Sequence, residues 1–452
     1  NVGSATAATG FNVANSCRFN PADSAYMHKT PDAGNRRTFT FSCWVKRSLI
    51  SSAQTLFWAG SSNDDYFAMR FEANNKFSLF EAVSGATNWG INTEPRVFRD
   101  TSAWYHVVVA VDTTQGTAAN RTKIYFNGIQ ETNLNTGDGY PAENRDTIFN
   151  TAVPHQIGHD YVGQYFGGYI AEACFLEGSQ NAPTDFGEFD DSGIWKPINV
   201  SGLTFGTNGF YLDFEASGNL GNDANGGTDL TESGLAAIDQ STDTCTNNFA
   251  TMNPLDNFYA GSTFSEGNLN LVMADAPTTW NTSTIGVSSG KWYFEVKELA
   301  EGASGSSQVG VADRPTVSAS EELGGLATTF AYTSNGRFRT DNGQTAADKA
   351  TWGVNDVIGI ALDMDASPAT VTFTKNGSAA GSTQNLTATG TGFYFLAIGA
   401  WVDGSVTFSA NFGSPAYSES GGNSDGSGYG NFKTAPPSGH FALNTKNLAE
   451  YG

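Results

Sequence analysis

The residues best suited to acid–base chemistry lie in the stretch GEFDDSG, where Glu188 and Asp190 alternate. Two carboxylates with a suitable separation can flank a glycosidic bond and hydrolyse it. Ser192 and Gly193 follow directly, however, and a stretch rich in Gly and Asp is typical of a turn. We therefore predict a solvated turn here and no catalytic residue.

Histidine offers a second kind of chemistry, because His155 and His159 are four residues apart. That spacing brings metal ligands together on a helix. Pro154 and Gly158 favour a strand instead, on which the two rings are spread along one face. The other histidines have no nearby Ser or Cys in the setting of a nucleophile. The sequence thus predicts neither a metal site at these histidines nor a catalytic triad.

Aromatic residues in turn-rich segments point to binding. Sugar recognition uses an aromatic ring with neighbouring Asp or Asn side chains that accept hydrogen bonds from hydroxyl groups. Trp89 in GATNWGIN and Trp401 in GAWVDG fit this description. In the second half, Tyr332, Arg337 and Trp352 are candidates on the same reasoning. Packing under a loop is the alternative for the two tryptophans, and the other three could equally face a neighbouring subunit.

The elements that position these residues follow from composition. The 452 residues include 52 Gly, 32 Phe, 16 Tyr and 9 Trp, which describes many short aromatic strands joined by turns in more than one domain. The formal net charge of -22 repels a phosphate backbone, so we expect no nucleic acid partner. The longest apolar runs fall far short of the roughly 20 residues of a membrane helix, so we expect no membrane insertion.

Period-two patterns predict two sets of antiparallel strands. In RTFTFSCWVKR, the apolar residues Phe39, Phe41 and Cys43 alternate with polar ones. In both halves a long apolar strand ends in Asp, as in WYHVVVAVD and DVIGIALDMD, and a short strand then runs into Asn-Gly, which is a strong hairpin signal. We therefore predict an all-β protein with two antiparallel β-sandwiches in tandem.

The domain boundaries follow from changes in composition. We place the first sandwich at 1–178, a connector rich in Gly and Asp with one short strand at 179–255, the second sandwich at 256–415 and a polar C-terminal tail at 416–452. The last residues of the tail could still dock on a sandwich. The cysteines form no CxxC pair, and two alternate with apolar residues, which favours buried thiols over the alternative of one or two disulfides. They are Cys17, Cys43, Cys174 and Cys245.

The first half resembles the laminin G and pentraxin-like branch of the concanavalin A-like jelly rolls in FTFSCWVKRS, WYHVVVAVDTT and FGGYIAEACFLEG. The second half resembles a SPRY domain, itself a concanavalin A-like sandwich, in GKWYFEVKE, WGVNDVIGIALDMD and VTFTKNG. Relatives of the first half often bind calcium at one rim of the sandwich. The resemblance therefore implies calcium as a cofactor and Asp112, Asp138 and Asp160 as candidate ligands, although each is also an ordinary strand-end or turn Asp.

The order of several motifs along the chain resembles proteins common in tailed phages of marine bacteria. These motifs include CRFNPADSAYMHKTP, FGEFDDSGIWKP and GTNGFYLDF. The resemblance implies a tail fibre, spike or capsid appendage on the virion surface, with other virion proteins and further copies of the chain as partners. We expect a non-enzymatic role in attachment to a host or environmental polysaccharide. The alternatives are a capsid decoration or self-assembling fibre protein without a ligand, and a secreted adhesin or polysaccharide-degrading enzyme.

Overall fold

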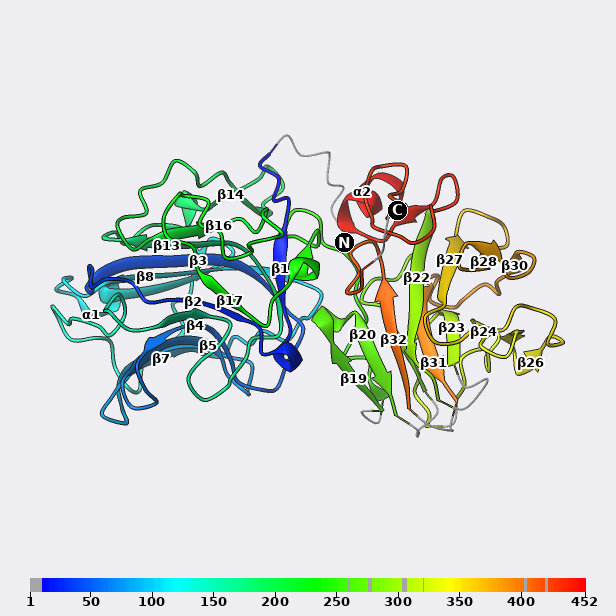
Figure 1. Ribbon diagram of the computed structural model, residues 1–452, viewed down its shortest axis with the longest axis horizontal. Helices are drawn as coiled ribbons and strands as arrows, with labels where there is room; N and C mark the ends of the chain where they lie inside the picture. The colour runs from blue at the N-terminus through cyan, green and yellow to red at the C-terminus, as the bar shows by residue number, and fades with distance from the viewer. Residues whose placement is uncertain are drawn as a thin grey trace. The chain divides into compact units, whose positions relative to one another are not determined.

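The computed structural model describes residues 10–258, 261–274, 279–302, 307–319, 321–401, 405–418 and 422–452. The chain divides into two compact units (Figure 1), one formed by residues 10–246 and the other by residues 247–452. In each unit the regular structure is nearly all β-strand, arranged in largely antiparallel sheets, which confirms the predicted all-β fold. Within these ranges, no helix has the length and apolar character needed to cross a membrane.

In the first unit, two sheets pack against each other. Sheet 1 has the strand order β10 (Ile129–Gln130), β9 (Thr122–Phe126), β8 (Trp104–Asp112), β3 (Thr38–Arg47), β13 (Gly168–Glu177), β1 (Ser16–Phe19) and β18 (Gln240–Ser241), with β16 (Phe210–Leu212) beside β13. Sheet 2 has the order β11 (Leu134–Asn135), β7 (Ala86–Thr93), β6 (Phe77–Val83), β5 (Tyr66–Phe71), β4 (Gln54–Gly60), β12 (His155–Ile157), β2 (Tyr26–Lys29) and β17 (Thr231–Ser233). The shorter elements are α1 (Ala118–Arg121), the hairpin of β14 (Gly187–Phe189) and β15 (Trp195–Pro197), and the 3-10 turns η1 (Pro21–Asp23), η2 (Pro183–Asp185) and η3 (Ala237–Asp239).

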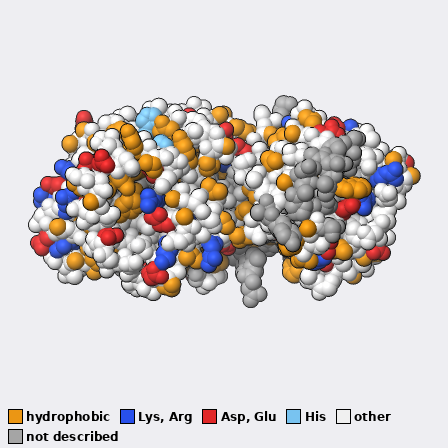
Figure 2. All heavy atoms as spheres, turned by 90° about the horizontal axis from the view of Figure 1, so that it is seen from below, with side chains coloured by type: hydrophobic (Ala, Val, Ile, Leu, Met, Phe, Trp, Pro, Cys, Tyr) orange, Lys and Arg blue, Asp and Glu red, His pale blue; other side chains and the backbone are white. Residues whose placement is uncertain are grey.

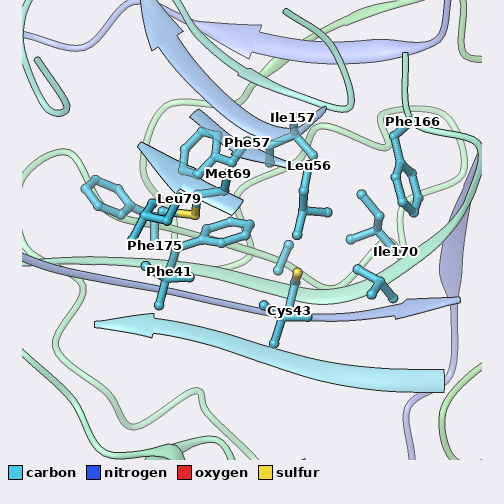
Figure 3. Close-up of a cluster of buried hydrophobic side chains, with 14 of the residues drawn as sticks. Phe41, Cys43, Leu56, Phe57, Met69, Leu79, Ile157, Phe166, Ile170 and Phe175 are labelled. Carbon is cyan, nitrogen blue, oxygen red and sulfur yellow. The ribbon is translucent and has the colours of Figure 1, made fainter. Parts of the chain in front are cut away.

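The core of the first unit lies between these two sheets, and Figure 3 shows side chains from both sheets meeting there. The rings of Phe41 on β3 and Phe57 on β4 approach to 4.6 Å between centroids. Phe39, Phe41 and Cys43, the predicted inward residues of β3, are fully buried. Each buried phenylalanine contributes roughly 1.5–3 kcal/mol relative to an exposed one. The burial of these three residues confirms the inward face that the period-two pattern predicts.

The predicted connector at 179–255 is wrong as far as residue 246, because this segment belongs to the first unit. It supplies β16 to β13, β17 to β2 and β18 to β1. A buried carboxylate holds its end in place: Asp243 accepts hydrogen bonds from Lys46 Nζ at 2.8 Å and Trp104 Nε1 at 3.1 Å. Buried charges are tolerated where they are paired and hydrogen-bonded. The segment therefore folds in spite of its linker-like composition.

Residues 183–205, which we call the cover, pack on the outer face of sheet 1 (Figure 1). Trp195 stacks on His106 of β8 with 5.9 Å between ring centroids. Phe186, Val200 and Phe205 from the cover are also buried. Both faces of sheet 1 are therefore shielded from water over this region.

The second unit also pairs two sheets. Sheet 3 has the order β19 (Ser262–Ser265), β20 (Asn270–Met273), β32 (Val406–Asn411), β22 (Lys291–Ala300), β27 (Val357–Asp363), β28 (Thr370–Lys375) and β29 (Ser378–Ala379), with β30 (Gln384–Asn385) beside β28 and β33 (Phe441–Ala442) beside β22. Sheet 4 has the order β21 (Thr279–Thr282), β31 (Phe395–Ala400), β23 (Ser307–Ala312), β24 (Thr329–Thr333), β25 (Arg337–Thr340) and β26 (Gly343–Gln344). The turn η5 (Glu266–Asn268) and helix α2 (Thr445–Tyr451) complete the unit.

The predicted Asn-Gly hairpins are present in both units. Asn127 and Gly128 join β9 to β10 with φ values of 49° and 78°. Asn376 and Gly377 join β28 to β29 with φ values of 49° and 84°. Tight hairpin turns of this type need positive φ at both central positions, which Asn and Gly accept at low cost.

The predicted polar tail at 416–452 is not a free linker: its described part from residue 422 docks on the second sandwich, as the sequence allowed for the last residues. Asp425 accepts hydrogen bonds from the backbone N–H of Ala442 and from Asn447 Nδ2, both at 2.8 Å. Phe432 is buried against Tyr293, with 5.1 Å between ring centroids. As in residues 179–246, hydrogen bonds to a buried carboxylate hold the segment in place. The segment lacks the alternating apolar pattern from which a folded strand is predicted.

The cysteines match the prediction of buried thiols. All four are free, and Cys17, Cys43 and Cys174 are buried while Cys245 is half-buried. Burial raises the pKa of the Cys43 thiol. These cysteines therefore behave as small apolar core residues.

Candidate binding site

Trp89 is not a surface platform, which corrects the prediction for this residue. It lies on β7 with its side chain 1% exposed in the core of the first unit, next to Phe67. Alternation along β7 points Trp89 and Ile91 inward and Gly90 and Asn92 outward. The segment that was interpreted as turn-rich is therefore a strand, and its tryptophan belongs to the core.

The second-unit candidates divide into two pairs. Tyr332 and Trp352 are buried together in the core, 5.9 Å apart between ring centroids, so the prediction that they contact a ligand is wrong. Trp401 follows β31, is 46% exposed, and has the Arg339 guanidinium 5.5 Å from its ring centroid. Strand alternation places Arg337 on the same outer face of sheet 4 as Arg339 and Trp401. Arg337 and Trp401 stay predictions of a second contact surface.

The predicted calcium ligands do not converge. No group of three or more His, Cys, Asp or Glu side chains in the described ranges could hold a metal ion. Asp112 accepts hydrogen bonds from Thr114 Oγ1 and Gln115 Nε2, both at 2.6 Å, and closes its own turn. Partial burial opposes its ionisation, but these hydrogen bonds outweigh burial and lower the pKa of Asp112.

Asp160 has a similar local role. It is buried, and it accepts hydrogen bonds from Thr55 Oγ1 at 3.0 Å and from the backbone N–H groups of Val162 and Gln164 at 3.0 and 2.9 Å. These bonds fix the loop that follows β12. The calcium site expected from Asp112, Asp138 and Asp160 is therefore not formed by these three residues together.

A Ser–His pair lies under the cover, where sequence reasoning expected no such neighbour. Ser42 Oγ lies 2.9 Å from His106 Nε2, and Trp195 Nε1 donates to His106 Nδ1 at 3.0 Å. Because Nδ1 accepts, the proton of the neutral ring is on Nε2 and points at Ser42. Burial lowers the pKa of His106 to about 3. The ring cannot take a proton from Ser42, so the pair is structural rather than catalytic.

The outer face of sheet 2 is only partly covered: Trp58 and Ala68 are buried, whereas Tyr66 and Phe80 keep part of their rings in water. Sheet 2 forms the lower layer of the first unit in Figure 1, and Figure 2 views that layer from outside, where hydrophobic, acidic and basic side chains are mixed. A groove of about 460 Å³ crosses the ends of β5, β6 and β7, and a hollow of about 180 Å³ adjoins it. The two share Glu72, Ser78 and Asn92 in their lining. They are therefore parts of one depression.

Two rows of outward side chains cross sheet 2 at right angles to its strands. The first row contains His28, Gln156, Trp58, Ala68, Phe80 and Gly90, from β2 to β7. The second row contains Arg70, Ser78, Asn92 and Asn135, from β5 to β11. One row is largely aromatic or small and the other is polar, so the groove has an apolar side and a hydrogen-bonding side.

Gly90 ends the first row on β7, two residues from Asn92 of the second row, and it keeps the groove open there. A Cβ at this position would lie 3.0 Å from the Cβ of Phe80 and 3.7 Å from Oδ2 of Asp138. Any larger side chain would project into the space between these residues. Asp138, predicted as a calcium ligand, instead lines this end of the groove.

Ion pairs neutralise the cations of the groove. Arg70 Nε lies 2.8 Å from Glu72 Oε1, and Lys76 is paired with Glu94. Paired surface charges of this kind contribute about 0–1 kcal/mol to stability. Their side chains instead offer donors and acceptors beside the amides of Asn92 and Asn135, so the groove is lined by hydrogen-bonding groups.

Aromatic rings border the groove on the side of the first row. Tyr66 packs edge-on to Phe80 with 5.7 Å between ring centroids and stacks on Trp58 at 6.3 Å. Tyr66 is half-buried, and burial raises the pKa of its hydroxyl, so it stays neutral in ordinary buffers. A half-exposed aromatic ring beside polar groups is a surface on which a sugar ring can pack.

Sequence reasoning missed this face, although a signal was present. In YFAMRF and KFSLFEA, alternation assigns Tyr66 and Phe80 to the outward positions, where polar residues are the usual choice. Aromatic residues on the solvent face of a strand mark either a covered surface or a contact surface. Only the three-dimensional placement of the cover on sheet 1 separates these two cases.

Comparison with protein families assigns a domain to each half of the chain. Residues 22–181 match the family model described as the concanavalin A-like lectin/glucanases superfamily, and residues 291–414 match that of the SPRY domain. The chain therefore carries a laminin G-type concanavalin A-like domain followed by a SPRY domain. A lectin-like domain and a SPRY domain together indicate a binding or structural module. No curated protein matches the chain.

Solved structures with similar folds include two human SPRY domains and a horseshoe crab pentraxin. The SPRY domain of human HERC1 is 17% identical over 35% of this chain and 96% of that chain, with a TM-score of 0.28. Another human SPRY domain is 20% identical over 33% of this chain and 94% of that chain, with a TM-score of 0.27. The heptameric SAP-like pentraxin from Limulus polyphemus is 12% identical over 50% of this chain and 98% of that chain, with a TM-score of 0.31.

Proposed function

We propose that this chain is a non-enzymatic attachment protein that binds polysaccharide through the groove on the outer face of sheet 2. The observation that carries the proposal is the open depression between the polar row and the aromatic row. Pockets for drug-like ligands are enclosed and mostly apolar. This groove is lined instead by amides, a hydroxyl and paired charges, which suits a hydrated ligand with many hydroxyl groups.

Affinity electrophoresis tests the proposal. The full chain is run through gels that contain laminarin, hydroxyethyl cellulose, dextran, alginate or carrageenan, and retardation reports binding. We expect at least one polysaccharide to retard the protein, and Asn92→Ala with Asn135→Ala to abolish most of the retardation. Asn120→Ala, an exposed position on α1, is the matched control. Free passage through every gel would overturn the proposal.

A separate assay tests the proposal that the protein is not an enzyme. Glu72 is a carboxylate that lines both parts of the depression, and it is paired with Arg70. We expect no reducing ends to appear when the protein is incubated with the polysaccharide that retards it. Release of reducing ends by the wild type, and its loss in Glu72→Gln, would instead favour the polysaccharide-degrading alternative.

We further propose that the protein is displayed on a virion surface, as a tail fibre, spike or capsid appendage. The support is the order of motifs along the chain, from CRFNPADSAYMHKTP to GTNGFYLDF, and the pairing of a lectin-like domain with a SPRY domain. Quantitative mass spectrometry of purified virus particles from the source tests this location. A few copies per particle would favour a fibre or spike, and a number near that of the capsid protein would favour decoration. Recovery only in the cell-surface or secreted fraction would overturn it.

A further inference from the structure

A second aromatic cluster lies at the other end of sheet 2, away from the groove. His159 lies between two tyrosine rings, with centroids 4.7 Å from Tyr26 and 4.3 Å from Tyr165. Tyr26 also packs on His28 at 5.5 Å. All four rings are half-buried, so each keeps part of its surface in water.

The loop after β12, which carries His159 and Tyr165 of this cluster, also exposes two large side chains to solvent. Tyr161 is 61% exposed and Val162 is 53% exposed. The loop is nevertheless fixed, because Asp160 accepts hydrogen bonds from within it and from Thr55 on β4. Arg70 of the groove reaches the same loop, with Nη1 donating to Gln164 Oε1 at 3.2 Å. A rigid aromatic surface loses little entropy on binding.

The two ends of sheet 2 are joined by a row of residues on its outer face, in which Trp58 and Ala68 are buried and His28, Gln156 and Phe80 are half-buried. That row runs from His28 on β2 through Gln156, Trp58 and Ala68 to Phe80 and Gly90 at the groove. It crosses six adjacent strands, which corresponds to roughly 24 Å at the usual strand spacing. A single sugar cannot reach both ends, whereas a polymer lying across the strands can.

Charge indicates what kind of polymer fits. The basic side chains of the groove, Arg70 and Lys76, are each paired with a carboxylate, and Asp138 adds a negative charge. The chain as a whole carries a formal net charge of -22. A sulfated or uronic acid polymer would be repelled at long range and would find no unpaired cation in the groove.

We infer that the ligand is an extended, uncharged polysaccharide chain that crosses the strands of sheet 2 and binds at two subsites, the groove and the cluster of Tyr26, His159, Tyr161 and Tyr165. This inference rests on the proposed function, because it assigns a ligand class and a second contact to the same face. Two linked contacts on one polymer strengthen binding beyond what either gives alone.

A length series tests the second subsite. The neutral polysaccharide that best retards the full chain is partly hydrolysed, and short and long oligosaccharides are titrated by calorimetry. For the wild type, affinity rises with chain length until the ligand spans the face. Tyr161→Ala should weaken binding of the long chains about tenfold, in line with the loss of one aromatic contact. It should leave the short chains unchanged, because they occupy only the groove.

Controls separate the two subsites and the two proposals. Asn92→Ala with Asn135→Ala should weaken short and long chains alike, and Phe393→Ala, an exposed aromatic residue of the second unit, should affect neither. Long chains bound equally by wild type and Tyr161→Ala would overturn the second subsite and leave the groove in place. Retardation by alginate or carrageenan alone would overturn the uncharged ligand. Binding of none of the polymers would overturn the proposed function itself.

Discussion

The two sheets of the first unit both place aromatic residues on their outer faces, with opposite results. On sheet 1, Trp44 and His106 lie beneath the cover, are buried, and stack at 4.8 Å between ring centroids. On sheet 2, Trp58 is buried but Tyr66 and Tyr26 keep part of their rings in water, and Tyr161 in the loop after β12 is largely exposed. The difference comes from the segment laid over the sheet. The comparison teaches that an aromatic outer face becomes core where the chain covers it and stays partly exposed where it does not.

The strongest way to break this comparison is to remove the cover. A chain of residues 10–178, the predicted first domain, lacks the cover, three edge strands and the carboxylate that pairs with Lys46. We expect it not to unfold cooperatively, since it would expose an apolar face and lose the ion pair between Lys46 and Asp243. A chain of residues 10–246 should unfold in a single transition. Circular dichroism and calorimetry on both chains measure this.

A cooperative transition in the shorter chain would mean that the cover is an accessory and that the predicted boundary at 178 was adequate. A failure of both chains would mean that residues 10–246 do not form an independent unit. Only the first result would contradict the role given to the cover.

A matched pair of substitutions sharpens the comparison further. Trp195→Ala removes the ring of the cover that stacks on His106 of β8, together with its hydrogen bond to that histidine. We expect it to lower the free energy of unfolding by about 3–5 kcal/mol. Tyr161→Ala on the open face should change it by no more than about 0.5 kcal/mol. Urea titration of the full chain measures both, and a large cost for Tyr161→Ala would show that its ring is structural.

The sequence predicted the strands of both sandwiches because their pattern is local. Phe39, Phe41 and Cys43 mark an inward face within five residues, and Asn127 with Gly128 marks a hairpin within two. The folding of 179–246 and of the tail could not be predicted in the same way. It depends on contacts between distant residues, such as Asp243 and Lys46, which are 197 positions apart in the sequence. The carboxylates that make these contacts have the same residue type as those of a solvated linker, so the sequence alone does not distinguish them.

The candidate site was predicted in part, for the same reason. Trp89 directed attention to β7, and Asp138 does line the groove. The groove itself depends on the register that aligns Phe80 with Gly90 and Ser78 with Asn92. Register between strands is set by the whole sheet, and a shift of one residue would exchange its two faces. Local spacing therefore pointed to this part of the chain as a candidate, without showing which side chains line the groove.

The smallest expected effect concerns pH and the covered face. Glu172 lies in the β-bulge of β13, and its carboxylate accepts a hydrogen bond from Tyr211 at 2.7 Å. Burial, with smaller contributions from Asp213 and Glu215, raises its pKa to about 7, against the opposing effect of Tyr211. Between the unfolded pKa of 4.5 and about 7, the folded chain therefore holds a proton that the unfolded chain has released.

The sign of the pH effect follows from this difference. The stabilisation is complete below about pH 4.5 and is lost as the pH rises through about 7, by at most about 3 kcal/mol. Glu172→Gln cannot ionise, so it should flatten the decline in the unfolding free energy of residues 10–246 over this range. The open face has no comparable buried acid among its groove residues, and Glu72→Gln is the matched control. An equal slope in wild type and Glu172→Gln would mean that water reaches this carboxylate, and the cover would then be a looser layer than the buried Trp195 and Phe186 indicate.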